Sequence, residues 1–156
     1  MYHSGIYLRY AFLVTQEYDI ETLIVAAHAL TRLAAAETRN ETPAAQWRTI
    51  SLLRDHGPLR IGELATLSRV TQPGMTRLAG QMADAGLLER TQDAADSRAT
   101  VLSVTDAGLA ALDEWRAQLR EALAPHFADL DDVEREALRV AASVLARRTG
   151  ALEVAR

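Results

Sequence analysis

Side chains that could make several directed hydrogen bonds at once gather in one short stretch, residues 71–77. Hydroxyl, amide and guanidinium groups occur there beside a residue with no side chain, the full set being Thr71, Gln72, Gly74, Thr76 and Arg77. A hydroxyl can donate to a phosphate, an amide can read an adenine edge, and a guanidinium can reach a phosphate or a guanine. Gly74 would let the backbone come close to a nucleic acid. The alternative interpretation is the solvated face of a surface helix.

A second group of polar candidates lies further along the chain. Arg98 would fit the minor groove of A·T-rich DNA, where narrow width concentrates negative potential. Asp96, two residues earlier, is expected to orient Arg98 by an ion pair, although a simple turn aspartate beside an exposed arginine is the alternative. Arg90 is either a contact to the DNA backbone or a solvated strand residue. Arg60 and Arg69 could bind phosphate, but structural roles are favoured for both.

The elements that must position these groups form a helix-turn-helix pattern. A short helix is predicted over residues 62–68, a turn at residues 69–70, and a second helix over residues 71–85. Thr71 is a good N-cap for the second helix, and Pro73 falls in its first turn, where proline is tolerated. Apolar residues recur on this helix at the spacing of a core-facing stripe, at Met75, Leu78 and Met82.

Strand-like segments at residues 88–92 and 99–104 enclose a polar, turn-prone tip and predict a β-hairpin. The expected fold class is therefore mainly α with a small β wing, a winged helix-turn-helix over residues 42–105. Flanking helices are predicted from Asp19 to Thr38, from Thr42-Pro43 to His56, from Asp106 to Leu123 behind a Thr105 cap, and from Asp131 to about Arg148.

The helices outside the winged region have apolar faces and no partner of their own. Terminal helices of this kind usually find a partner in a second copy of the chain. Residues 19–41 and 106–156 are therefore expected to form a homodimerisation region. Residues 1–18 are expected to form an N-terminal extension, as a further helix or strand.

The composition is that of an ordinary soluble domain of 156 residues, with a formal net charge of −4. All the positive side chains are arginine, which suits bidentate recognition of phosphates and guanines. Cysteine is absent and the four histidines are widely spaced, so neither a metal site nor a cofactor is expected. The opening apolar run is too short to span a bilayer and has no basic leader. No membrane association is expected, and the cytoplasm is the expected location.

Several motifs in the same order resemble the MarR-type (multiple-antibiotic-resistance regulator) transcription factors. The matching pieces are residues 42–47, residues 59–65, the stretch from Val70 to Leu78, the Asp96-x-Arg98 pattern, and the Ser103-Val104-Thr105-x-x-Gly108 step. Together the likeness covers about residues 19–148. It implies a homodimeric winged-helix regulator that binds a pseudo-palindromic site on double-stranded DNA, and a repressor is the expected function.

The resemblance also implies a small ligand, lipophilic or phenolic, bound between the dimerisation and DNA-binding parts, which releases the DNA. Candidate lining residues are His28, Arg32, Trp47, His56 and Trp115. The plainer interpretation makes the tryptophans core aromatics and the others satisfied surface or interface groups. Charges of both signs balance over residues 60–100, so an alternative function is a winged-helix protein-interaction module that does not bind DNA. An enzyme is disfavoured because no nucleophile–base pair or phosphate-binding glycine loop is present.

Overall fold

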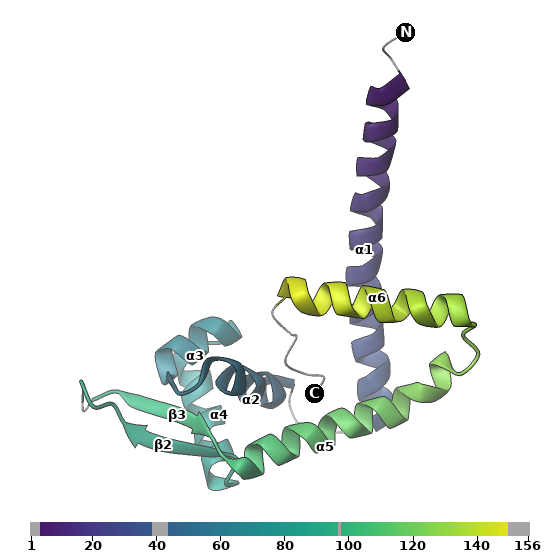
Figure 1. The fold of residues 1–156 in the computed structure, drawn as a ribbon. Coiled ribbons are helices and arrows are strands. Elements are labelled where there is room, and N and C mark those ends of the chain that lie inside the picture. Colours follow the sequence, from purple (N-terminus) through teal and green to yellow (C-terminus); the bar gives the residue numbers. More distant parts are fainter. Residues whose placement is uncertain (1–3, 39–43, 97, 150–156) are drawn as a thin grey trace. The chain divides into compact units, whose positions relative to one another are not determined.

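The computed structural model describes residues 4–38, 44–96 and 98–149 (Figure 1), with side chains from Tyr18 onward. The chain forms two compact units, Met1–Asn40 and Glu41–Arg156, which are described separately. The first unit contains helix α1 (Ser4–Thr38). The second contains α2 (Ala44–His56), β1 (Leu59–Arg60), α3 (Ile61–Ser68), α4 (Gln72–Asp84), β2 (Leu88–Gln92), β3 (Thr100–Val104), α5 (Asp106–Leu123), the 3-10 turn η1 (Ala124–Phe127) and α6 (Asp132–Thr149).

Helix α1 is continuous from Ser4, so the prediction that this helix begins at Asp19 was wrong. Asp19 resembles a cap in sequence, but residues 6–18 contain no proline or glycine that would end a helix before it. Apolar residues are spread around α1 instead of forming one stripe. Large side chains of α1 are more than half exposed, namely Tyr18, Ile20, Ile24 and Val25. A helix of this kind needs another surface to cover it.

None of the helices in the described ranges is both long and apolar enough to cross a membrane.

Helix α2 contributes apolar side chains to the core of the second unit. Its predicted cap, Thr42, and first residue, Pro43, lie outside the described residues. It ends at His56, and Gly57 follows with φ 76°, a left-handed conformation that glycine adopts without a steric penalty. The predicted glycine stop is therefore confirmed.

The core of the second unit lies where α2, α3, α4, α5 and the sheet meet. The side chains without appreciable exposure include Ile50, Leu53, Leu64, Met75, Met82, Leu102 and Leu112. Met75 and Met82 therefore face the core as predicted, and Leu78 is half-buried against it. Trp47 of α2 stacks on Trp115 of α5 with ring centroids 5.1 Å apart and planes 10° from parallel.

The three strands form one antiparallel sheet in the order β1-β3-β2. The predicted hairpin is confirmed, with Leu88 opposite Val104 and Gln92 opposite Thr100. Strand β1 pairs with β3 through Arg60 opposite Val101, a pairing that was not predicted because two residues carry no periodic pattern. This pairing places Arg60 beside the hairpin.

The caps predicted for the last two long helices are confirmed. Thr105 Oγ1 accepts a hydrogen bond from the Gly108 N–H at 3.0 Å at the start of α5. Asp131 and Glu134 form a reciprocal capping box before α6, with N···O distances of 3.0 Å and 2.8 Å. No residue of α6 is buried. Its large apolar side chains are therefore exposed, among them Val133, Leu138, Val140, Val144 and Leu145.

Candidate nucleic-acid interface

The N-terminal half of α4 presents the predicted polar face to solvent. Gln72, Thr76 and Arg77 are exposed, while Met75 between them is fully buried. This division follows from helical spacing, because residues four apart share a face and the intervening apolar residues face the core. The structure therefore brings together the residues that the sequence singled out on this helix.

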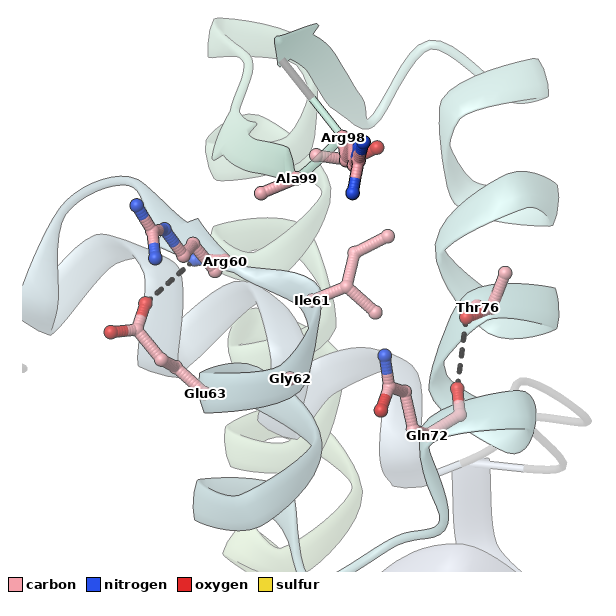
Figure 2. A pocket seen from close by; sticks show the side chains of 9 residues that line it. Arg60, Ile61, Gly62, Glu63, Gln72, Thr76, Arg98 and Ala99 are labelled. Carbon is pink, nitrogen blue, oxygen red and sulfur yellow. Dashed lines mark hydrogen bonds between the residues drawn. The ribbon is translucent and has the colours of Figure 1, made fainter. Parts of the chain in front are cut away.

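The two threonines of this face differ in the proton that each can offer. Thr71 caps α4 by accepting the Gly74 N–H at 3.3 Å, so its own hydroxyl proton can still donate. Thr76 donates its proton to the Gln72 carbonyl oxygen at 2.9 Å (Figure 2), which leaves only acceptor capacity. Phosphate oxygens accept hydrogen bonds, so Thr71 is the better phosphate donor of the two.

Gly74 also serves the cap itself. A Cβ placed on Gly74 would lie 3.0 Å from Thr71 Oγ1, the atom that accepts its N–H. Glycine at this position therefore lets the capping hydroxyl come close to the helix. The sequence did not predict this role, because it suggested only that Gly74 lets the backbone come close to DNA.

A groove of about 340 Å³ separates the start of α3 from the start of α4. Figure 2 shows Arg60 and Glu63 on one side of this groove, Gln72 and Thr76 on the other, and Arg98 at one end. The complete lining comprises Arg60, Ile61, Gly62, Glu63, Gln72, Thr76, Arg98, Ala99 and Thr100. Residues from α4 and from the hairpin thus line one hollow.

The hairpin loop is organised by Asp93. Asp93 Oδ1 accepts the N–H groups of Ala95 and Asp96 at 2.8 Å and 3.1 Å, which folds the loop back on itself. The other carboxylate oxygen, Oδ2, accepts from Arg60 Nε at 2.8 Å. The Arg60 guanidinium, helped by these backbone N–H groups, lowers the pKa of Asp93 to about 2. The Arg60–Asp93 pair was missed because its members are 33 residues apart in sequence.

The contact between Asp96 and Arg98 differs from the prediction. Asp96 Oδ1 accepts the backbone N–H of Arg98 at 3.0 Å, whereas an ion pair with its guanidinium was expected. The two-residue spacing favours a short turn in which an aspartate bonds its own backbone, and this local geometry occupies the carboxylate. Asp96 therefore fixes the backbone of Arg98 and leaves its guanidinium exposed.

Four exposed arginines around α4 and the hairpin carry guanidinium groups with no hydrogen bond or ion pair to any described residue: Arg69, Arg77, Arg90 and Arg98. Arg69 lies in the turn between α3 and α4 with φ 54° and ψ 42°, a left-handed conformation. These groups are free to bind an external anion.

The five predicted ligand-pocket residues lie in different surroundings. Trp47 and Trp115 stack on each other in the core, while His56 is exposed at the end of α2. His28 and Arg32 are exposed on α1, in the other unit. Within the second unit, the structure brings Trp47 and Trp115 together. Across the described ranges, no group of three or more potential metal-ligating side chains occurs.

The arrangement of α3, α4 and the hairpin defines a winged helix-turn-helix, and the comparisons with known proteins agree. The MarR family model matches residues 43–100. The uncharacterized HTH-type transcriptional regulator Mb0904 of Mycobacterium bovis is 33% identical over 100 residues, which cover 64% of this chain and 70% of that relative. The HTH-type transcriptional repressor MdtR of Bacillus subtilis is 31% identical over 102 residues, 65% of each chain.

The fold extends this similarity beyond the matched segment. RV1404 from Mycobacterium tuberculosis superposes with a TM-score of 0.69 at 22% identity, covering 86% of this chain and 93% of that one. The chain belongs to the MarR family and is a helix-turn-helix transcriptional regulator. The resemblance and the fold class inferred from the sequence are therefore confirmed.

Proposed function

We propose that this regulator binds double-stranded DNA as a homodimer, with α4 in the major groove and the β2–β3 hairpin in the adjacent minor groove. The observation that carries the proposal is the exposed polar face of α4 beside four unpaired arginines. Two such faces, one from each copy, would read a pseudo-palindromic site whose half-sites lie about one helical turn apart. Like its relative MdtR, the protein would act as a repressor.

The net charge of the chain is −4, but three of the carboxylates near the proposed interface accept hydrogen bonds within the protein. Asp93 is paired with Arg60, and Glu63 accepts the Arg60 backbone N–H at 2.8 Å at the start of α3. Asp96 accepts the Arg98 N–H. The acidic groups thus shape the loop and the helix start, while the unpaired guanidinium groups supply the contacts to DNA.

The residues of the interface would have distinct roles. Gln72 and Arg77 lie on the exposed face of α4, where an amide can read adenine and a guanidinium can read guanine or bind phosphate. Thr71 would donate to a phosphate from the cap position. Arg90, exposed on β2, would add a contact to the DNA backbone. Arg98 would enter the minor groove, where its delocalised charge suits the narrow, negative channel.

The dimer would be built from the terminal helices. α1 exposes apolar residues on several sides, and α6 has no buried residue. Exposed aliphatic side chains at this density mark an association surface, and a second copy provides the matching one. Sedimentation should show a dimer at low micromolar concentration. A monomer under those conditions would contradict the role given to these helices.

A small lipophilic or phenolic effector is also proposed for this regulator. The support for this effector is the family likeness alone. The effector would stabilise one arrangement of the two units and so change the spacing of the recognition helices. Isothermal titration with phenolic carboxylates, with and without bound DNA, would detect it. Affinities that are equal for the free and DNA-bound protein would refute a regulatory role.

The experiment that tests DNA binding compares Arg98→Ala with Arg156→Ala, which removes the same charge at the end of the chain. Fluorescence anisotropy with the protein's own upstream DNA should show a strong loss of affinity for Arg98→Ala and none for Arg156→Ala. The slope of log affinity against log salt should fall by about 0.9 per subunit for Arg98→Ala. If the wild-type protein binds no DNA at all, the protein-interaction function takes the place of this proposal.

A further inference from the structure

Arg60 and Arg98 are linked by a continuous series of contacts that passes through the hairpin loop. Arg60 Nε donates to Asp93 Oδ2 at 2.8 Å, and Asp93 Oδ1 accepts the Asp96 N–H at 3.1 Å. Asp96 Oδ1 then accepts the Arg98 N–H at 3.0 Å. Each step fixes the backbone that carries the next, so the position of Arg98 depends on where Arg60 holds Asp93.

The Arg60–Asp93 contact joins the hairpin loop to a firmly held part of the backbone. Arg60 belongs to β1 and immediately precedes α3, so its backbone is held both by the sheet and by the Glu63 carboxylate. The Asp93 side chain is only 15% exposed, whereas the Arg60 side chain is 46% exposed. The lowered pKa of Asp93 and the raised pKa of Arg60 both reflect this hydrogen-bonded ion pair. The loop is therefore fastened to the helix-turn-helix at one well-defined point.

We propose that Arg60 and Asp93 form a clasp that positions Arg98 for the minor groove, so that DNA affinity depends on two residues that need not contact DNA themselves. The inference rests on the proposed function of the hairpin as a DNA-binding wing. It assigns Arg60 and Asp93 as positioning residues. Specificity for DNA shape at the minor groove would then depend on a contact made on the protein's own surface.

The clasp makes a prediction opposite in sign to that of simple electrostatics. Removing the negative charge of Asp93 should strengthen binding to a polyanion if charge alone mattered. The clasp predicts weaker binding, because an unfixed Arg98 still makes its contact but must first be ordered, which costs conformational entropy. The salt dependence separates the clasp from a direct phosphate contact by Arg60. Losing a direct phosphate contact lowers the slope of log affinity against log salt. Losing a positioning residue leaves the number of phosphate contacts, and therefore this slope, unchanged.

The experiment measures operator affinity and its salt dependence for Arg60→Ala, Asp93→Asn, the double variant, and the reversed pair Arg60→Asp/Asp93→Arg. The Asp93→Asn substitution keeps a side-chain oxygen that can accept the Ala95 and Asp96 N–H groups, so it removes the charge while retaining the loop's own hydrogen bonds. Arg98→Ala serves as the reference for complete loss of the wing contact, and Arg156→Ala as the neutral control. Circular dichroism confirms that each variant is folded.

We expect Arg60→Ala and Asp93→Asn each to weaken binding by about three- to tenfold, with the double variant no weaker than either single one. The salt slope should stay at the wild-type value, and the reversed pair should recover part of the affinity. Tighter or unchanged binding by Asp93→Asn would overturn the clasp. A lowered salt slope for Arg60→Ala with no effect of Asp93→Asn would also overturn it, by making Arg60 a direct contact. If Arg98→Ala binds DNA as tightly as the wild type, the hairpin is not a DNA-binding wing. That result refutes the proposed function of the hairpin, on which the clasp rests.

Discussion

Replacing Gly108 with alanine tests whether the wing is joined to α5 as tightly as the structure indicates. Gly108 is buried in the first turn of α5, directly against the carbonyl of Leu87. A Cβ at this position would lie 2.3 Å from Leu87 O and 2.9 Å from Val104 Cγ2. Carbon and oxygen normally approach no closer than about 3.3 Å, so one backbone segment would have to move by about 1 Å.

The atom that a Cβ on residue 108 would meet belongs to the backbone of Leu87 and not to a flexible side chain, so the expected loss of stability is large. Leu87 O also accepts the Thr105 N–H at 3.1 Å, so moving it strains the hydrogen bond that joins the start of β2 to the end of β3. Overpacking of this kind costs about 1–3 kcal/mol, and weakening the hydrogen bond adds about 1 kcal/mol. The expected loss of unfolding free energy for Gly108→Ala is therefore about 3 kcal/mol, or a Tm lowered by about 6–12 °C.

A matched variant separates this steric effect from the general effect of glycine in helices. Gly80 lies within α4, and a Cβ placed there would meet nothing within 4 Å. Gly80→Ala should therefore stabilise the protein by about 1 kcal/mol through helix propensity. Chemical denaturation at one fixed protein concentration would measure both variants, because association affects the apparent stability. A Gly108→Ala protein as stable as wild type would refute the packing described for this joint.

Three further outcomes follow from the structure. Thr71→Ala should lower the free energy of unfolding by about 1 kcal/mol, because the Gly74 N–H loses its capping acceptor; thermal melts that show no change would contradict the cap. Arg69→Gly should raise the free energy of unfolding by about 1 kcal/mol, because glycine adopts φ 54° without steric strain. A destabilised variant would show that the arginine side chain supports the turn. The pKa of Asp93 is lowered from 3.8 to about 2, so this group should add stability that is fully present above pH 3.8 and lost as the pH falls toward 2. Carbon-detected NMR at pH 3 should find the Asp93 carboxyl mostly ionised. A titration midpoint near 3.8 would contradict the ion pair with Arg60.

The features that the sequence predicted well are set by neighbouring residues. Thr71, Thr105 and Asp131 each cap a helix whose first N–H groups lie within three residues, so side-chain chemistry and spacing suffice. The buried positions Met75 and Met82 followed from helical spacing, and the hairpin followed from two strand-like runs around a polar tip. The exposed face of α4 was predicted for the same reason.

The features that sequence reasoning missed depend on distant contacts or on competing local geometry. The Arg60–Asp93 pair forms only because β1 joins β3, and no local pattern reports that pairing. The Asp96 carboxylate bonds a backbone N–H in its own turn, which the spacing of Asp96 and Arg98 alone does not reveal. The start of α1 was misplaced because Asp19 looks like a cap, although the preceding residues also form helix.

The reading of a specific two-fold-related DNA site by α4 and the wing is tested most directly by a pull-down of fragmented genomic DNA with the purified chain. We expect enrichment of a small set of promoter-region fragments that share two inverted half-sites, with centres about 10 base pairs apart. Enrichment should disappear for Arg98→Ala and persist for Arg156→Ala. Recovery of fragments that share no motif, or of no DNA above background, would contradict sequence-specific binding by α4 and the wing.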